Sequence, residues 1–549
     1  MLRRLLRDAE EEQPSKAAEM IPSGWGMAFR EIFEKRVERD GKKPFVFFRD
    51  QVIDYVTLQG KVHKAANLLR ELGVRKGDRV CLFLPNCLEF LYLWFGLAEI
   101  GGVMVPLDVN LRGEGLKYII NHCDAQWIIM NERLQDTYAS VQNDLPRMKH
   151  RIWHGETDPP KDHFLSLSRL MEAAEEKAPP ALAIRDEDPL AILYTSGATG
   201  PPRGAMISHF NYLNSGEIWA KDIIHYRPDD IFFTTLPLFH ANAQMFTTMG
   251  SLLSGRPFVL RERFFASRFF DEIRQYGATI FNYIGGMLAM LMKQPERAED
   301  ADNPARAAFG AAAPPETWRA FEKRFKVTIV AGYGLTESGG LCLCNPPEEI
   351  KVGSIGKPLR FCDATIWDEN NMEVPIGENG EIVVKERTPY SMFLGYYKQP
   401  DKTKEAWEGG WFHTGDRGYR DENGYFYFID RIKEGIRRRE ENISAVEIEK
   451  VANSHPKILE SAVIPVPSDL GEDDVMLFAV LRPKERLDPE ELIAFCEERM
   501  AYFMVPRYVQ YVEALPKTAG QKIQKYELKK RGIGDAWDRE KAGYKLTRF

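Results

Sequence analysis

Apolar and polar positions in the first four hundred residues alternate between two kinds of spacing. Residues 56–72 repeat apolar side chains at helical spacing and predict an amphipathic helix. Residues 80–84 and 103–107 are short apolar runs, which predict buried strands. Between them, Asn86 is placed to cap a helix that continues to about Ile100. Helices that alternate with short strands predict α/β architecture for this part of the chain.

The pattern changes near residue 430. A strand-like run at 425–429 is followed by a charged stretch that ends at Ser444. Ser444 and Glu447 have the spacing of a capping box and predict the start of a helix. We therefore expect a large N-terminal α/β domain with several sheets over residues 1–430 and a small α+β domain over residues 434–549.

The composition is that of a globular protein of 549 residues, of which 44% are apolar and 28% charged. A net charge of −7 gives no reason to expect a nucleic-acid partner. The longest apolar run, residues 90–105, contains Glu99 and three glycines, so we expect no transmembrane segment. The first residues lack the apolar core of a signal peptide, and the seven cysteines are scattered. Both observations predict a cytoplasmic protein with reduced cysteines.

The most informative segment is residues 191–204, which read Ala-Ile-Leu-Tyr-Thr-Ser-Gly-Ala-Thr-Gly-Pro-Pro-Arg-Gly. An apolar run leads into a loop of glycines and hydroxyls that ends in a cation. Glycine lets backbone N–H groups turn towards an anion, and the hydroxyls and the arginine add donors. The segment predicts a phosphate-binding loop, although its spacing is not that of a Walker loop. Its candidate residues are Thr195, Ser196, Gly197, Ala198, Thr199, Gly200 and Arg203.

This string resembles the signature of the adenylate-forming superfamily, which includes acyl-CoA synthetases, luciferases and the adenylation domains of peptide synthetases. In that family the loop holds the β- and γ-phosphates of ATP. Arg203 stands in place of the family's lysine and keeps the charge, whereas Ala198 lacks the hydroxyl of the family's threonine. The resemblance covers nearly the whole chain and implies a mobile C-terminal lid with a hinge over residues 431–433, at Lys433.

Further segments resemble family motifs in the family's order. Tyr333-Gly334-Leu335-Thr336-Glu337 follows an apolar run, and strand ends are where ligands bind in α/β sheets. By resemblance, Thr336 contacts the α-phosphate and Glu337 holds Mg²⁺, a cation that needs few protein carboxylates. The resemblance also assigns the adenine site to the segment with Gly310, Ala311 and Ala312, and the ribose site to Asp416 and Arg431. Tyr333 and Gly334 are further nucleotide-binding candidates.

The remaining candidates concern the acid and CoA. His240 resembles an aromatic residue that borders the carboxylate and the thiol tunnel, and Lys522 a lid lysine whose charge meets the carboxylate and the α-phosphate during attack. Glu440 replaces a glycine that lines the pantetheine path in the family, so the thioester step is the one that this change affects. The other candidates are Arg438 and Arg439 for the CoA phosphates, and Tyr283, Gly285, Gly286 and Met287 for a mainly apolar acyl pocket.

These features predict an ATP-dependent acyl-CoA synthetase that uses Mg²⁺ and CoA and converts a small-molecule carboxylic acid through an acyl-AMP. Residues 263–270 resemble the carnitine/crotonobetaine–CoA ligase branch. Two alternatives stay open. The first stops at acyl-AMP or transfers the acyl group to a separate carrier protein, which Glu440 favours. The second is a non-catalytic nucleotide- or acyl-binding relative, against which the retained Glu337 and Lys522 argue. A homodimer also stays open.

Overall fold

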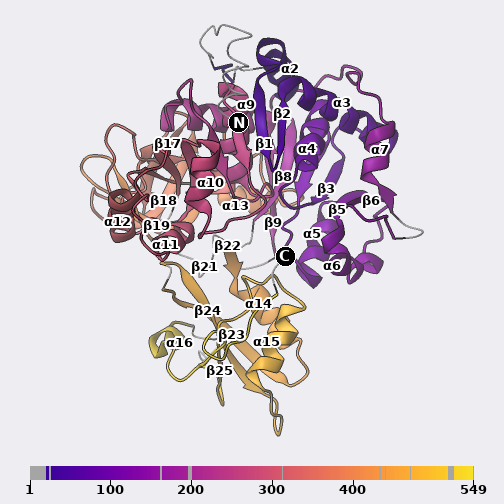
Figure 1. Cartoon of the computed structure of the whole chain (residues 1–549). Coiled ribbons are helices and arrows are strands. Elements are labelled where there is room, and N and C mark those ends of the chain that lie inside the picture. Colours follow the sequence, from indigo (N-terminus) through magenta and orange to yellow (C-terminus); the bar gives the residue numbers. More distant parts are fainter. Residues whose placement is uncertain are drawn as a thin grey trace.

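The computed structural model describes residues 20–23, 26–160, 164–195, 201–311, 313–431, 435–438, 441–469, 471–516, 523 and 525–547. It has a large N-terminal part and a smaller C-terminal part that lies below it in Figure 1. Buried apolar side chains form one cluster between Ile21 and Phe426, and two separate clusters from Ile436 onward. The two parts therefore have separate hydrophobic cores, which confirms the expected fold class.

A nine-stranded sheet forms one half of the N-terminal part. Its strands from β14 to β1 pair in parallel, and the strands at both edges are antiparallel. In spatial order they are β16 (Lys357–Pro358), β15 (Leu343–Cys344), β14 (Thr328–Tyr333), β13 (Ala307–Ala311), β12 (Ile280–Ile284), β10 (Phe232–Thr234), β11 (Phe258–Leu260), β1 (Pro44–Phe48) and β2 (Gln51–Asp54).

Two further sheets complete the N-terminal part. A seven-stranded sheet is parallel except for its last pair, in the order β7 (Leu165–Ser166), β6 (His150–His154), β5 (Trp127–Asn131), β3 (Arg79–Phe83), β4 (Val103–Pro106), β8 (Pro189–Thr195) and β9 (Arg203–Ser208). A four-stranded antiparallel sheet contains β17 (Cys362–Trp367), β18 (Gly380–Glu386), β19 (Phe412–Arg420) and β20 (Phe426–Arg431).

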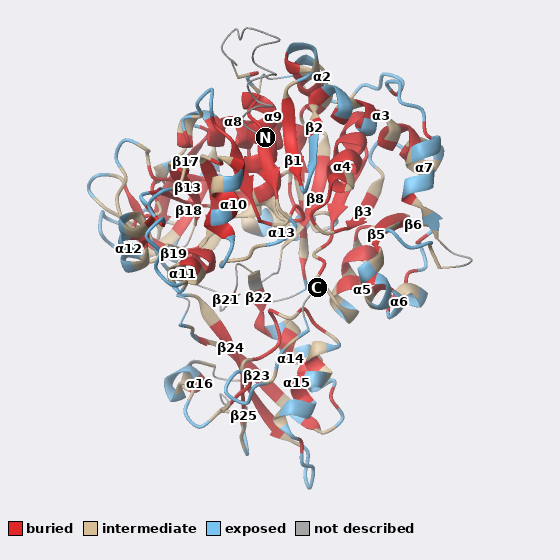
Figure 2. Cartoon of the chain, in the orientation of Figure 1, coloured by how far each residue is buried: buried red, intermediate tan, exposed pale blue. Residues whose placement is uncertain are grey.

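Helices cover these sheets, and Figure 2 shows burial concentrated in the central strands, with exposed positions on α7 and α12. The helix expected over residues 56–72 is α3, which Asp54 caps by accepting the Thr57 N–H at 2.7 Å. The helices are α2 (Phe29–Asp40), α3 (Tyr55–Glu71), α4 (Leu88–Ile100), α5 (Gly113–His122), α6 (Gln135–Ala139), α7 (Leu167–Ala173), α8 (His209–Glu217), α9 (Met249–Ser254), α10 (Phe269–Tyr276), α11 (Gly285–Met292), α12 (Pro315–Phe325) and α13 (Pro400–Ala406).

The expected cap at Asn86 is wrong. Cys87 is the N-cap of α4. The Asn86 amide donates to the carbonyl oxygens of Leu236 and Arg261 and accepts the Leu238 N–H at 2.7 Å. Residues distant in sequence thus satisfy this side chain and hold the loop before α4 against the loop that follows β10.

The C-terminal part begins with a hairpin at the junction with the N-terminal part (Figure 1). Ser444 caps α14 as predicted, because its hydroxyl accepts the Glu447 N–H at 3.4 Å. The hairpin is β21 (Gly435–Arg438) and β22 (Glu441–Ser444), followed by a sheet of β23 (Ile458–Pro467), β24 (Asp473–Leu481), β25 (Tyr508–Tyr511) and β26 (Trp537–Asp538), with α14 (Ala445–Asn453), α15 (Pro489–Glu497) and α16 (Lys525–Arg531). Among the helices of the described ranges, none has the length and apolar character to span a membrane.

Candidate active site

The hairpin β8–β9 positions the ends of the predicted phosphate loop. Thr195 and Arg203 are register partners at the end of this hairpin, so the loop between them leaves the sheet at one edge. The Thr195 hydroxyl donates to Glu337 Oε1 at 3.0 Å, although the two residues are 142 positions apart. The structure therefore brings the first residue of this loop against the predicted Mg²⁺ ligand. Ser196, Gly197, Ala198, Thr199 and Gly200 lie outside the described residues.

Glu337 lies in a short 3₁₀ turn, Thr336–Ser338, directly after β14. It is buried, with 7% of its surface exposed, and both hydrogen bonds described for its carboxylate arrive at Oε1. One comes from Thr195 and the other, also at 3.0 Å, from the Tyr396 hydroxyl. Hydroxyl donors on one oxygen leave the other oxygen able to meet a hard cation, so the group fits the single-carboxylate ligation that Mg²⁺ accepts beside phosphates.

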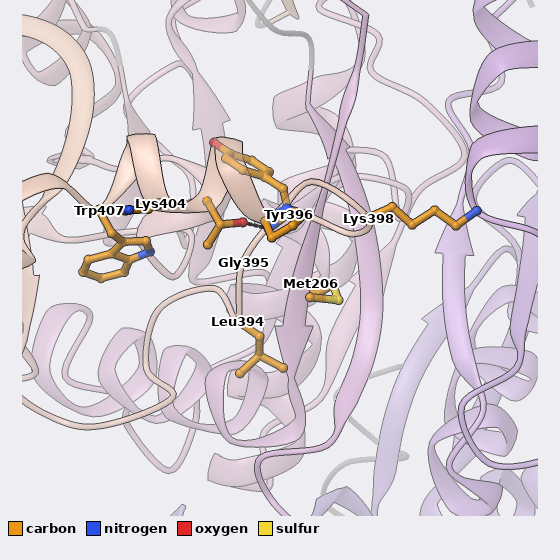
Figure 3. A pocket seen from close by; sticks show the side chains of 9 residues that line it. Met206, Leu394, Gly395, Tyr396, Lys398, Lys404 and Trp407 are labelled. Atoms are coloured by element: carbon orange, nitrogen blue, oxygen red, sulfur yellow. Dashed lines mark hydrogen bonds between the residues drawn. The ribbon is translucent and has the colours of Figure 1, made fainter.

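Tyr396 is a site residue that the sequence reasoning missed. Burial and the neighbouring Glu337 charge raise the pKa of its hydroxyl, which keeps it a hydrogen-bond donor at neutral pH. The Arg203 guanidinium carbon lies 5.4 Å from the centre of its ring, a cation–π distance. Figure 3 shows Tyr396 beside a pocket of about 520 Å³, where its backbone N–H donates to the Thr403 hydroxyl at 2.8 Å. Tyr396 thus connects the phosphate loop with the metal-binding candidate.

The ribose candidate Asp416 lies where two sheets meet. The Tyr333 hydroxyl, at the end of β14, donates to Asp416 Oδ2 in β19 at 2.7 Å. Asp416 is only 2% exposed. The burial of Tyr333 and the neighbouring Asp416 charge raise the pKa of the Tyr333 hydroxyl. Arg431 is the register partner of Asp416 in β20, but its side chain lies outside what the structure describes. A carboxylate held by one tyrosine keeps acceptor capacity for the two hydroxyls of a sugar.

The predicted adenine segment forms a tightly packed strand end. Gly310 is the register partner of Tyr283, and a Cβ at Gly310 would lie 2.0 Å from the Tyr283 carbonyl oxygen. Gly334 is similarly confined, since a Cβ there would lie 2.4 Å from Leu341 Cα. Both glycines are therefore required by close backbone approach. Ala311 ends β13, and Ala312 lies outside the described residues.

His240 meets the C-terminal part. Its Nε2 lies 2.7 Å from Oε1 of Glu441, a residue of β22, and both side chains are partly exposed. Asp108, which follows β4, has a carboxylate oxygen within 4.8 Å of both groups. Burial and the Glu441 charge raise the pKa of Asp108 to about 6. Segments of three different sheets thus converge on one imidazole.

The predicted acyl residues divide into two groups. Gly286 and Met287 line a cavity of about 1360 Å³, to which the C-terminal part contributes Glu472 and Tyr502. Tyr283, by contrast, is completely buried in β12, and Gly285 begins α11. Apolar side chains that line the cavity include Phe239, Phe264 and Met290. Charged side chains that line it include Lys61, Glu262 and Arg263.

The candidates in the hinge and lid are only partly described. Arg438 is buried, its Nε lies 2.8 Å from Asp474, and its guanidinium donates to the carbonyl oxygen of Val505 at 2.8 Å. In this arrangement the arginine stabilises the C-terminal core and is not presented to solvent. Lys433, Arg439, Glu440 and Lys522 lie outside the described residues.

Comparison with known proteins agrees with this geometry. Residues 33–397 match the family model of AMP-binding enzymes, and residues 447–522 match the AMP-binding enzyme C-terminal domain. A crotonobetaine/carnitine–CoA ligase of Proteus mirabilis (strain HI4320) is 36% identical over 91% of this chain and 98% of its own.

Two solved structures have the same overall organisation. An anthranilate CoA ligase in complex with anthranoyl-AMP has a TM-score of 0.71 and 26% identity, covering 92% of this chain and 97% of its own. A fatty acyl CoA synthetase of Mycobacterium tuberculosis has a TM-score of 0.67 and 26% identity, covering 92% and 98%. The chain therefore belongs to the AMP-binding enzyme family, among its ATP-dependent acyl-CoA synthetases that proceed through an acyl-AMP.

Proposed function

We propose that this site activates a carboxylic acid with ATP and then transfers the acyl group to CoA, with named residues in separate roles. The observation that carries the proposal is the hydrogen-bonded group of Thr195, Tyr396 and Glu337, which joins the phosphate loop to a buried carboxylate. A second buried carboxylate, Asp416, accepts a hydrogen bond from Tyr333 at the end of β14. This arrangement suits a nucleotide whose ribose and phosphates extend along the ends of β14 and β8.

In the first half-reaction, a carboxylate oxygen of the acid attacks the α-phosphorus of ATP. The bond from that phosphorus to the β-phosphate oxygen breaks, and pyrophosphate leaves. Arg203 and the loop after Thr195 hold the β- and γ-phosphates, and Thr336 positions the α-phosphate. Glu337 would hold Mg²⁺, which neutralises phosphate charge when bound. Lys522 would meet the charge that gathers between carboxylate and phosphate, because preorganised cations stabilise such transition states.

In the second half-reaction, the thiol sulfur of CoA loses its proton to solvent and attacks the acyl carbon. The bond from that carbon to the phosphate oxygen breaks, and AMP leaves. The contact of Glu441 with His240 supports a lid pose in which β21–β22 faces the acyl site. We propose that the lid turns about residues 431–433 between the two steps, so that Lys522 serves the first and the hairpin the second. Glu440, next to Glu441, would then border the path of the thiol.

The acid is expected to be mainly apolar, because Phe239, Met287 and Met290 line the cavity beside Gly286. A second candidate is an acid with a cationic group, as the name of the Proteus mirabilis relative suggests. One observation favours it: a Cβ at Gly286 would lie 4.0 Å from Glu472 Oε2, so the lid brings a carboxylate to the pocket rim. Aromatic side chains and a carboxylate together suit a quaternary ammonium.

A product survey tests the proposed function. The full-length protein is incubated with ATP, Mg²⁺, CoA and a pool of apolar, aromatic and trimethylammonium acids, and the products are identified by mass spectrometry. An acyl-CoA together with AMP is the expected result, and its mass identifies the acid. Acyl-AMP alone would contradict the CoA step and support transfer to a carrier protein, with Glu440→Gly as the next variant. Nucleotide binding without turnover of any acid would support a non-catalytic relative.

We further propose that the enzyme acts in the cytoplasm. All seven cysteines are free and buried, and Cys81 Sγ lies 3.8 Å from Cys123 Sγ without a disulfide. Neighbouring thiols that stay reduced are typical of a reducing compartment. Fractionation of the source cells, with the protein detected by antibody, would test this assignment.

A further inference from the structure

Three potential metal ligands converge on the wall of the large cavity, and none of them is among the candidate ATP-binding residues. Cys87 is the N-cap of α4, Glu89 lies in the first turn of that helix, and His154 ends β6. The Cys87 sulfur, a Glu89 carboxylate oxygen and a His154 ring nitrogen all lie within 4.8 Å of one another. All three residues belong to the N-terminal part, so their arrangement does not depend on the position of the lid.

We infer that Cys87, Glu89 and His154 form a binding site for a thiophilic divalent cation such as Zn²⁺. Sulfur, imidazole nitrogen and carboxylate oxygen are the ligands that Zn²⁺ takes in proteins. A thiolate in the set disfavours Mg²⁺ and Ca²⁺, which prefer oxygen ligands. The site is thus chemically distinct from the Mg²⁺ site proposed at Glu337, and it does not rest on the proposed reaction.

The sulfur of Cys87 is buried at the start of α4. Burial and the charge of the neighbouring Glu89 raise the pKa of its thiol well above the usual range. A cation that binds here must therefore displace the thiol proton. On binding, the sulfur–metal bond replaces the S–H bond, and the thiol proton goes to solvent. No electron is transferred.

A fourth side chain holds the imidazole. His154 Nε2 lies 3.3 Å from Glu89 Oε2, and His154 Nδ1 lies 2.9 Å from Asn131 Nδ2. Coordination through Nε2 puts the ring proton on Nδ1, so the Asn131 amide must turn its oxygen towards that proton. It would then give up the Arg133 N–H that this oxygen accepts at 3.1 Å. An aspartate at position 131 offers an oxygen on both sides and should therefore strengthen the site.

The fourth coordination position opens onto the cavity. Cys87, Glu89, Asn131 and His154 all line the cavity of about 1360 Å³ that also contains Gly286 and Met287. Three protein ligands with one open position are the arrangement of zinc sites that exchange a water or bind a small molecule. Water would complete the coordination sphere, and a thiol or carboxylate that enters the cavity would compete for the same position.

Metal titration tests the inference. Full-length protein without an added histidine tag is treated with a chelator, dialysed, and titrated with Co²⁺ while its absorption is recorded, and then with Zn²⁺ by calorimetry. We expect one equivalent of Co²⁺ to give a thiolate-to-metal charge-transfer band and visible bands of four-coordinate cobalt. Cys87→Ser should abolish the charge-transfer band and weaken Zn²⁺ affinity by about tenfold or more. Asn131→Asp should tighten Zn²⁺ binding.

The matched control is Cys496→Ser, which replaces another buried cysteine, located in the C-terminal core. This variant should keep the parent cobalt spectrum and Zn²⁺ affinity. If Cys87→Ser does not fold, His154→Gln provides the same comparison, with circular dichroism to confirm the fold. A parent protein without a charge-transfer band, or variants at Cys87 and His154 that bind Zn²⁺ as tightly as the parent, would overturn the inference.

Discussion

Glu441 of the C-terminal part lies 2.7 Å from His240 of the N-terminal part, measured from Oε1 to Nε2. The two residues are 201 positions apart, and the bond joins hairpin β21–β22 to the loop that follows β10. If the lid turns between half-reactions, as proposed above, a contact made in one pose acts on one step only. This relationship separates the two chemical steps experimentally.

Glu441→Ala should slow acyl-CoA formation more than acyl-AMP formation. The variant removes the carboxylate that contacts His240 in this pose, and the proposed rotation of the lid would break the contact during adenylation. We expect a loss of about tenfold or more in the thioester step, which corresponds to about 1.4 kcal/mol. Quenched-flow analysis of acyl-AMP and acyl-CoA from one turnover measures both steps.

The control for Glu441 is a double-mutant cycle with His240→Ala. If the two residues act through their contact, the double variant should be little worse than either single variant in the thioester step. Additive losses, or an equal loss in both half-reactions, would contradict a role confined to the second step. Glu485→Ala, on the exposed surface of the lid, serves as the matched glutamate variant.

Glu337→Gln should abolish most of the adenylation activity while the fold is kept. Glutamine still accepts hydrogen bonds from Thr195 and Tyr396, but its neutral oxygen is a poor ligand for Mg²⁺. We expect acid-dependent exchange between ATP and labelled pyrophosphate to fall by about 10²- to 10³-fold. Glu378→Gln, at an exposed turn, should exchange at the parent rate. Parent-like exchange in Glu337→Gln would remove Glu337 from the metal site.

Tyr333→Phe should weaken ATP binding and destabilise the fold. The variant removes the hydroxyl that donates to the buried Asp416 carboxylate at 2.7 Å. Loss of such a bond to a buried charged group costs about 1.5–3 kcal/mol. Thermal unfolding and the KM for ATP measure the two effects. Tyr419→Phe is the matched control, since Tyr419 lies in β19 with Asp416 but no hydrogen bond joins these two described residues, and equal losses in both variants would contradict a specific role for Tyr333.

Asp108→Asn should stabilise the protein above about pH 6 and leave its stability unchanged near pH 4. The pKa of Asp108 rises from 3.8 to about 6 on folding, so the folded state binds the proton more tightly. This preference favours folding below pH 3.8 and is lost as pH rises to about 6, where the folded protein holds an unfavourable charge.

Urea unfolding of the parent and Asp108→Asn at several pH values measures this difference. We expect the variant to be more stable by about 1–2 kcal/mol at pH 7.5, allowing for solvent screening of a partly exposed group. The difference should shrink progressively below pH 6. A constant difference at all pH values would show that Asp108 acts through packing or hydrogen bonding and not through its charge.

The sequence predicts those parts of the site that depend on local order. The apolar run before Thr195 forms β8, and Glu337 follows β14, as strand-then-loop patterns indicate. Ser444 caps a helix because its hydroxyl accepts the N–H of Glu447, only three positions along the chain. These features use contacts between residues close together in the chain, and a short window of sequence therefore contains the information.

Contacts between distant segments could not be predicted in this way. Tyr396 reaches Glu337 only because β9 and the loop after β18 are brought together, and no motif marks this tyrosine. Asparagine is a favoured residue type for a helix cap, yet the Asn86 amide donates to carbonyl oxygens 150 and 175 positions away. Asp108 likewise meets His240 and Glu441 from a different sheet. Contacts of this kind depend on the register of several sheets, which periodicity alone does not fix.

Transfer of labelled oxygen from the acid to AMP tests the central claim most directly. The acid identified in the product survey is labelled with ¹⁸O in its carboxylate, and AMP and pyrophosphate are analysed by mass spectrometry after one turnover. Attack of the carboxylate on the α-phosphorus followed by thiol attack on the acyl carbon predicts one ¹⁸O atom in AMP and none in pyrophosphate. Label in pyrophosphate, or unlabelled AMP beside newly formed acyl-CoA, would contradict an acyl-AMP route.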